Sequence, residues 1–338
     1  MSGPKEDCEP VSSNETISAA SVGKSGGLPR LTAASVGPWI ALVALVVIFS
    51  TLNGNFFSVR NAVNIVQQAA VLTVLSLGGT FVILMGSIDL SVGSVVSMSG
   101  MFAATMMRDH GPWAALLAPL LGAGLGAVNG ILFAYARLPS FLTTLGMLFA
   151  VNGLTLYGSQ GTAVSLEPDN PVATVFNGTL FGIPTIALWS AAVLAVAAFA
   201  AARTRFGRYL YAIGGGETVA RLNGVPVARF KFYAFVVSGL LAGFAAVLLM
   251  LRVSGSDPAM GTPLLLPAIA AVVMGGTPLT GGVGGPLRTL LGVMIITILQ
   301  NGMNLADVNP FLQDVVLGAG VIVAVAVNMD RRATILVK

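Results

Sequence analysis

Long runs of apolar residues alternate with short polar connections along most of the chain. The runs are continuous, without the strict apolar and polar alternation of barrel strands, which favours helices. Backbone amides in hydrocarbon must be hydrogen-bonded internally, and a helix achieves this within one segment. Each run approaches the roughly 20 residues that a membrane-crossing helix needs. The predicted spans are 38–57, 62–86, 90–107, 113–135, 141–157, 184–202, 231–250, 264–280, 286–304 and 311–328.

The same pattern divides the chain into three parts. Residues 1–33 are rich in Ser, Gly, Glu, Asp and Pro and lack a continuous apolar run, so we expect a disordered cytoplasmic tail. Residues 34–330 form the transmembrane domain, and residues 331–338 a short cytoplasmic C-terminal tail. The predicted fold is all-α, a polytopic membrane bundle of about ten transmembrane helices.

Composition excludes a water-soluble protein and narrows the possible chemistry. Of 338 residues, 55% are hydrophobic and 9% charged, whereas an average soluble chain has about 25% charged residues. Cys8 is the only cysteine and lies in the tail, so an intrachain disulfide or a cysteine-based metal cluster is impossible. His110 is the only histidine, so we expect no metal site.

Basic residues indicate the orientation of the predicted helices. With the N-terminus in the cytoplasm, only Arg60, Arg108 and Arg252 of the 17 basic residues fall on the outer side. Because basic residues resist translocation, this bias supports an even number of spans and cytoplasmic termini. The net charge of +4 therefore reports orientation, and we expect no nucleic-acid partner.

Glycines recur at four-residue spacing in two of the predicted spans. Gly122, Gly126 and Gly130 share one helix face, and Gly239 and Gly243 share another. Small residues at this spacing let helices approach closely where lipid gives no hydrophobic drive for association. We interpret them as packing faces.

A connection of about 203–230 joins the sixth and seventh spans on the cytoplasmic side, where a partner would dock. Glycines and a proline bracket a segment in it that predicts a helix of one to two turns. Glu217 lies at the N-terminal end of this helix, and Arg221 can pair with it across one turn. Val219 and Leu222 form a small apolar face.

The segment reads Ala-Ile-Gly-Gly-Gly-Glu-Thr-Val-Ala-Arg-Leu-Asn-Gly-Val over 212–225. It resembles the permease subunits of ABC importers of the ribose, xylose and galactose type, whose loop reads Ala-Ile-Gly-Gly-Asn-x-x-Ala-Ala-Arg-Leu-Ser-Gly-Ile. Gly216 and Val219 depart from that pattern. The resemblance implies that this loop couples the permease to an ATPase. The residues implied in coupling are Gly215, Glu217, Ala220, Arg221, Leu222 and Gly224.

Three further motifs extend the resemblance over about 38–330. Residues 86–93 read Gly-Ser-Ile-Asp-Leu-Ser-Val-Gly, where the family has Gly-Gly-Ile-Asp-Leu-Ser-Val-Gly. Leu-Pro-Ser-Phe at 138–141 and the glycine-rich stretch 275–282 match as well, with Pro278 where the family usually has Ser.

The resemblance implies a transport subunit of the bacterial inner membrane that is no enzyme itself and translocates a monosaccharide-like solute. It binds no cofactor, and ATP and Mg belong to a partner ATPase. Further implied partners are an extracytoplasmic solute-binding protein, a second permease copy or a paralogue, and membrane lipids.

Asp89 is the only acidic residue between about 62 and 107, and a carboxylate at membrane depth is costly enough to need a reason. With Ser91 and Ser94 it can cap the start of the third span. A role of the Asp89, Ser91 and Gly93 motif in gating or in the translocation path is the alternative.

A neutral, hydroxyl-rich solute needs a path lined by uncharged hydrogen-bonding side chains, because fixed charges would bind water and ions. Amide side chains within the predicted spans are candidates, although they could equally bond neighbouring helices. They are Asn64, Gln67, Gln68, Asn152, Gln300, Asn301 and Asn304.

Two other functions stay open at the level of sequence. The same class of permease could carry branched-chain amino acids, nucleosides or a signalling furanose. An ion-coupled secondary transporter normally needs membrane-buried charged residues, and only Asp89, Asp307 and Asp314 approach that description.

Overall fold

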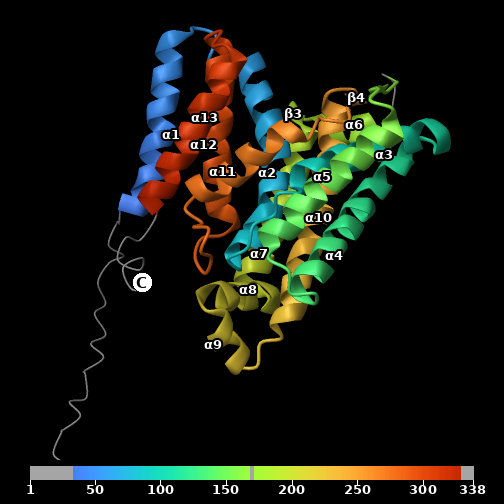
Figure 1. Cartoon of the computed structure of the whole chain (residues 1–338). Helices are drawn as coiled ribbons and strands as arrows, with labels where there is room; N and C mark the ends of the chain where they lie inside the picture. Colours follow the sequence, from blue (N-terminus) through green and yellow to red (C-terminus); the bar gives the residue numbers. More distant parts are fainter. Residues whose placement is uncertain (1–32, 168–170, 329–338) are drawn as a thin grey trace, which may run out of the picture. The chain divides into compact units, whose positions relative to one another are not determined.

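A computed structural model describes residues 33–167 and 171–328, so residues 1–32 and 331–338 of the two predicted tails lie outside the described residues. A helix occupies each of the ten predicted apolar ranges (Figure 1). These helices are α1 (Ala33–Leu52), α2 (Val59–Leu84), α3 (Val92–His110), α4 (Ala118–Ala134), α5 (Ser140–Ser159), α7 (Thr185–Arg203), α10 (Val227–Arg252), α11 (Leu265–Met274), α12 (Pro286–Leu305) and α13 (Pro310–Asn328).

Within the described residues, five helical segments are long and apolar enough to cross a bilayer. They are Val59–Leu84, Pro112–Ala134, Ser140–Ser159, Thr185–Arg203 and Val227–Arg252. The segment Pro112–Ala134 joins the 3-10 helix η1 (Pro112–Leu117) to α4. Several further apolar helices are shorter, among them Thr262–Met274. The chain is therefore an all-α, multi-pass membrane protein.

The eighth predicted range, 264–280, is only partly helical. The 3-10 helix η2 (Thr262–Leu264) precedes α11, and α11 ends at Met274. Ten residues of α-helix span about 15 Å, half of a hydrocarbon core of about 30 Å. The predicted span extended past the end of α11 because residues 275–282 are only weakly polar and do not interrupt the apolar pattern. Gly276 instead takes a φ of +91° that ends the helix.

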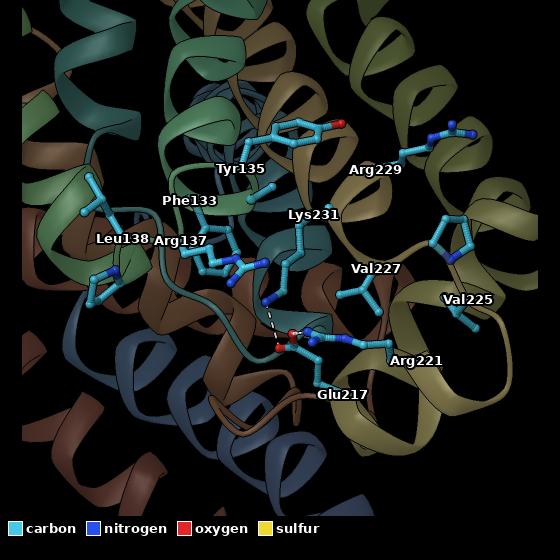
Figure 2. A pocket seen from close by; sticks show the side chains of 14 residues that line it. Phe133, Tyr135, Arg137, Leu138, Glu217, Arg221, Val225, Val227, Arg229 and Lys231 are labelled. Atoms are coloured by element: carbon cyan, nitrogen blue, oxygen red, sulfur yellow. Dashed lines mark hydrogen bonds and ion pairs between the residues drawn. The ribbon is translucent and has the colours of Figure 1, made fainter.

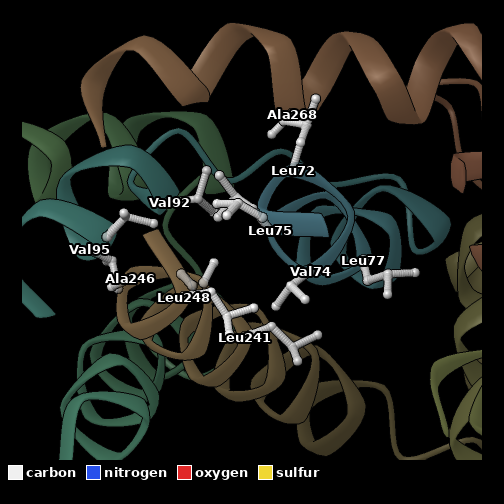
Figure 3. Close-up of a cluster of buried hydrophobic side chains, with 14 of the residues drawn as sticks. Leu72, Val74, Leu75, Leu77, Val92, Val95, Leu241, Ala246, Leu248 and Ala268 are labelled. Carbon is white, nitrogen blue, oxygen red and sulfur yellow. The ribbon is translucent and has the colours of Figure 1, made fainter. Parts of the chain in front are cut away.

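The core of the bundle lies around α2 and α10 (Figure 3). Leu72, Val74 and Leu75 of α2 are buried against α10 residues that include Leu248, and α3 and α11 close the cluster. By contrast, most residues of α5 and α7 are only partly buried or are exposed. In a membrane protein such exposed apolar faces meet lipid, so we expect α5 and α7 at the periphery.

The predicted glycine faces of α4 and α10 pack directly against each other. A side chain on Gly122 would overlap the carbonyl oxygen of Gly239, and one on Gly126 would overlap the carbonyl oxygen of Phe235. Gly243 lies equally close to the carbonyl of Ala118. The predicted packing role of these glycines is confirmed.

Connections that are far apart in sequence meet at the two ends of α10. Two short helices, α8 (Arg205–Gly215) and α9 (Glu217–Leu222), precede its N-terminus. Strand β4 (Gly255–Ser256) follows its C-terminus and pairs antiparallel with β1 (Val164–Ser165). Nearby, α6 (Pro171–Asn177) donates a hydrogen bond from the Asn177 amide to the Leu251 carbonyl at 3.2 Å.

A second ribbon, β2 (Thr179–Leu180) with β3 (Ile183–Pro184), leads into α7. Its tip at Phe181 is 96% exposed. Because α10 is 26 residues long, its ends lie about 39 Å apart. The α8 and α9 end and the β1 and β4 end are therefore separated by about the thickness of a bilayer.

Candidate functional site

The connection between α7 and α10 folds into the short helix that the sequence predicts. Gly216 separates α8 from α9, and Gly224, with a φ of +79°, ends α9. A left-handed residue just past a helix is a common stop, and glycine adopts it without a steric cost. The segment is therefore held as a compact turn at one end of the bundle (Figure 1).

Glu217 ties α9 to the first turns of α10. Its carboxylate accepts a hydrogen bond from Arg221 at 2.7 Å, as predicted, and another from Lys231 Nζ at 2.7 Å (Figure 2). Lys231 has a side chain only 14% exposed and lies 4.6 Å from the ring centroid of Phe133 in α4. One carboxylate thus links α9, α10 and, through Lys231, α4.

These contacts change the acidity of Glu217. The hydrogen bond from Lys231 is the main cause that lowers the pKa of the carboxyl below its ordinary value. Partial burial acts in the opposite direction, and the charges of Lys231 and Arg221 add to the lowering. Glu217 is therefore ionised at neutral pH and keeps both cations in place.

The outer face of α9 carries apolar side chains that the fold leaves uncovered. Val219 is 63% exposed and Leu222 is 83% exposed, whereas Ala220 between them is buried. Both lie on a short helix with charged residues, outside the long apolar segments that face lipid. Exposed apolar residues rimmed by charges are typical of a protein-binding surface.

A pocket of about 720 Å³ lies beside α9, between the α4–α5 connection and the start of α10 (Figure 2). Its charged lining residues are Arg137, Glu217, Arg221, Arg229 and Lys231. Four cations face one carboxylate, so the pocket is suited to an acidic group.

Two of the sequence motifs that carry the resemblance meet next to this segment. The amide of Gly282 donates to the carbonyl of Leu84 at 2.9 Å, which joins the glycine-rich loop 275–285 to the end of α2. Gly214 of α8 packs against both groups so closely that a side chain there would overlap them. Tyr211 of α8 also donates to the carbonyl of Gly284 at 2.8 Å. The loop after α2, the glycine-rich loop and α8 are thus in direct contact.

Asp89 is buried within a hydrogen-bonded cluster at the start of α3. Its carboxylate accepts from the Ser91 amide at 3.0 Å, the Ser91 hydroxyl at 2.6 Å and the Ser238 hydroxyl of α10 at 2.9 Å. Asn129 of α4 donates to the Ser91 hydroxyl at 2.8 Å.

Asp89 therefore binds Ser91, the residue that precedes α3, and not the amides of the first turn of α3. The contact with α10 was not expected from sequence. Gly93 lies against the carbonyl of Gly261 and Leu265, where a larger residue would crowd the approach of α3 to η2. Both roles given for Asp89 from sequence, a cap of α3 and a part in gating, stay predictions.

The predicted pathway residues separate into three groups. Gln68, Gln300 and Asn304 line one pocket of about 270 Å³, together with Arg252, Thr297 and Gln313. Asn301 of α12 is buried and donates to Asn61 of α2 at 2.9 Å. For Asn301 this agrees with the other interpretation, in which the amide side chain bonds a neighbouring helix.

The remaining candidates do not line this pocket. Asn64 and Gln67 lie on α2 and Asn152 lies on α5, outside the pocket residues. Arg252 and Thr297 were missed as site residues, because nothing local to either position indicates which helix face it occupies.

Comparisons with known proteins cover most of the chain. The family described as branched-chain amino acid transport system, permease component, matches residues 61–325. The chain is 39% identical over 301 residues to the ribose import permease protein RbsC of Escherichia coli strain K12, across 87% of this chain and 93% of that protein.

Two further relatives agree with this match. A probable ABC transporter permease protein of Sinorhizobium fredii strain NBRC 101917 / NGR234 is 38% identical over 293 residues, across 85% of this chain and 87% of the relative. The xylose transport system permease protein XylH of Escherichia coli strain K12 is 32% identical over 385 residues, across 94% of this chain and 98% of the relative. The chain therefore belongs to the family of permease components of ABC transport systems.

Proposed function

We propose that this chain is the membrane-spanning subunit of an ABC importer that carries a monosaccharide of the ribose, xylose or galactose class across the bacterial inner membrane. The observation that carries the proposal is α9, a short helix with exposed Val219 and Leu222 that is anchored to α10 through Glu217 and Lys231. The names of the ribose and xylose permeases among its relatives support the substrate class.

The ATPase of the complex is a separate subunit that binds ATP and Mg. It docks on α9 from the cytoplasm, with Val219 and Leu222 in an apolar recess and an acidic group near Arg137 and Arg229. The coupling residues are the six expected from sequence, to which we add Lys231. The six are Gly215, Glu217, Ala220, Arg221, Leu222 and Gly224. Closure of the ATPases moves α9 and the attached N-terminus of α10 as a lever.

The rest of the assembly follows the same scheme. Two permeases, either two copies of this chain or one copy and a paralogue, enclose the pathway. An extracytoplasmic binding protein delivers the solute on the side opposite α9. This chain supplies no ATPase site and holds no cofactor of its own.

In this proposal all ten apolar segments cross the membrane, α11 together with the non-helical residues 275–280 that follow it, and both termini lie in the cytoplasm. Three contacts between connections support it, because each of the three joins connections that the ten-span topology puts on the same side. On the outer side β1 pairs with β4, and Asn53 donates to the Leu305 carbonyl at 2.8 Å. On the inner side Gly282 bonds Leu84.

Cysteine labelling tests this topology. Cys8 is the only native cysteine, so Leu222→Cys and Phe181→Cys in a Cys8→Ser background give single-thiol proteins with exposed sites at opposite ends. A membrane-impermeant maleimide added to intact spheroplasts should label Phe181→Cys alone. Labelling of Leu222→Cys before lysis would contradict the orientation.

A second substrate class is favoured by one observation, the description of the matching family as a branched-chain amino acid permease. The two classes are separated by uptake into proteoliposomes that contain the permease, its ATPase and its binding protein. We expect accumulation of ribose or xylose that requires ATP hydrolysis and that leucine does not compete. Accumulation of leucine would favour the second class, and uptake driven by a proton or sodium gradient without ATP would overturn both.

A further inference from the structure

A polar pocket lies near the end of α10 that is opposite α9. Its volume is about 270 Å³, close to the lower end of the range for small-molecule sites, about 300 Å³. It is built from four long helices, because Gln68 lies on α2, Arg252 on α10, Gln300 on α12 and Gln313 on α13. Under the proposed topology this is the outer half of the protein, where a solute enters.

Most hydrogen-bonding side chains of this pocket have no partner among residues 33–167 and 171–328. Among the described residues, none forms a hydrogen bond or ion pair with the side chains of Gln68, Arg252 or Gln300. Asn304 accepts one bond, from Gln313 at 2.9 Å, which leaves its own amide hydrogens free. A concave surface with several convergent free donors and acceptors is typical of a ligand site.

Thr297 gives an independent indication. It lines the pocket from α12, is 1% exposed and has a buried hydroxyl without a hydrogen-bond partner among the described residues. A buried unsatisfied hydroxyl is costly, and most threonines within helices avoid the cost by bonding a backbone carbonyl one turn earlier, as Thr155 does here. Thr297 differs from the equally unpartnered Ser76 and Ser99 in that it lines the pocket, which makes its hydroxyl a candidate partner for a solute there.

The lining restricts the chemistry of that partner. Its described hydrogen-bonding side chains are four amides, one hydroxyl and one guanidinium, without a carboxylate among them. An amino-acid zwitterion would leave its ammonium group without a counter-charge, which is costly in a partly buried site. Arg252 departs from the uncharged lining expected from sequence. Vicinal hydroxyl groups can accept from its guanidinium and from the amides, and they can donate to the amide oxygens.

We propose that this pocket is a transient binding site for a neutral, hydroxyl-rich solute on its way through the permease. Gln300 and Thr297 contact the solute directly, and Arg252 donates to two of its hydroxyl groups from the outer side. The site rests on the proposed import function, and it assigns solute contact to Arg252 and Thr297, which sequence reasoning had not considered.

The test is ATP-dependent uptake by the reconstituted complex of permease, ATPase and binding protein, with radiolabelled D-ribose and D-xylose as probes. Thr297→Val is the sharpest variant, because it keeps the shape of the side chain and removes only an unpaired hydroxyl. We expect uptake to fall about fivefold, the effect of one hydrogen bond lost from the bound solute. Gln300→Ala, which removes two bonding groups, should lower uptake at least about tenfold.

The thermal midpoints of both variants should equal or exceed that of the wild type, which separates a solute contact from a structural role. Ser76→Ala is the matched control, since Ser76 has an equally buried unpartnered hydroxyl on α2 and does not line the pocket. Its uptake should match the wild type.

The outcomes distinguish this inference from the proposed function. If the wild type takes up the sugars and Thr297→Val and Gln300→Ala do so at the same rate, the pocket is not a solute site. The import function would be unaffected by that result. Unchanged uptake of both sugars in Arg252→Gln would overturn the assignment of a solute contact to Arg252. Failure of the wild type to accumulate either sugar would overturn the import function, and this inference with it.

Discussion

Asp89 shows how one buried carboxylate can hold three helices together. It accepts three hydrogen bonds, and through Ser91 and Ser238 it connects the start of α3 to α4 and α10. The surrounding donors are neutral hydroxyl and amide groups. An amide in place of the carboxylate could satisfy only part of this set, because one of its two polar atoms is itself a donor.

We therefore expect Asp89→Asn to lower the free energy of unfolding by about 1–3 kcal/mol, the cost of a buried group left without its partner. The measurement is the thermal midpoint of the purified protein in a mild detergent. Ser99→Ala is the control, because the buried hydroxyl of Ser99 has no partner among the described residues. Equal midpoints for Asp89→Asn and Ser99→Ala would argue against a structural role for the cluster.

Glu217 makes the contact between α9 and α10 dependent on pH. Its pKa is lower in the folded protein than its ordinary value of 4.5, mainly through the hydrogen bond from Lys231. A lowered carboxyl pKa stabilises the fold fully above the unfolded-state pKa, and the stabilisation is lost as the pH falls through the lower folded-state value.

Acidification below about pH 4.5 should therefore lower the thermal midpoint of the wild type more than that of Glu217→Gln. The quantity to compare is the difference in midpoint between neutral pH and about pH 3.5, because other carboxyl groups then cancel between the two proteins. The effect is small, since the Glu217 side chain is 39% exposed and solvent screens the pair. An identical pH dependence in both proteins would contradict the proposed anchor.

At the scale of elements, the contact of α4 with α10 depends on backbones that approach without side chains between them. Helices in lipid associate through close packing and not through a hydrophobic drive, so the glycine faces are a main source of their affinity. Gly126→Ala would place a methyl group on the carbonyl oxygen of Phe235. We expect a loss of about 1–3 kcal/mol, as for other overpacked sites.

Gly146→Ala in α5 is the matched control, because no atom lies within 4 Å of the added methyl group. Alanine favours the helix by up to about 1 kcal/mol over glycine, so this variant should be unchanged or more stable. Thermal midpoints of the two variants decide the matter. A loss of similar size in both would mean that close packing of α4 on α10 is not the cause.

The helices and the α9 segment could be predicted from sequence because their signals are local. Continuous apolar runs define a span, and the spacing of Glu217 and Arg221 defines a pair on one helix. The ion pair of Lys231 with Glu217 was missed because the two residues are 14 positions apart. A turn separates them, and the hydrophobic pattern does not show in which direction that turn leads the chain. Gln68, Gln300 and Asn304 were predicted as pathway candidates, but the presence of Arg252 and Thr297 in their pocket escaped prediction, since the rotation of each helix is set by its packing.

At the scale of the whole molecule, the described connections gather at two ends that are separated by the length of α10. One end carries α8, α9 and the two motif loops that meet at Gly214 and Gly282. The other carries the β1 and β4 ribbon and, close by, the polar pocket at Arg252. The helix α10, which packs on α4 and α2, joins the two ends.

The most direct test of this account is site-directed crosslinking from α9. Leu222→Cys in a Cys8→Ser background is treated in membranes with a short thiol-to-amine crosslinker, and the product is identified by mass spectrometry. We predict a crosslink to an ABC ATPase subunit that changes in yield when ATP is added, and no such product from Phe181→Cys at the opposite end. No ATPase crosslink from Leu222→Cys, or one from Phe181→Cys instead, would contradict the claim that α9 is the docking element.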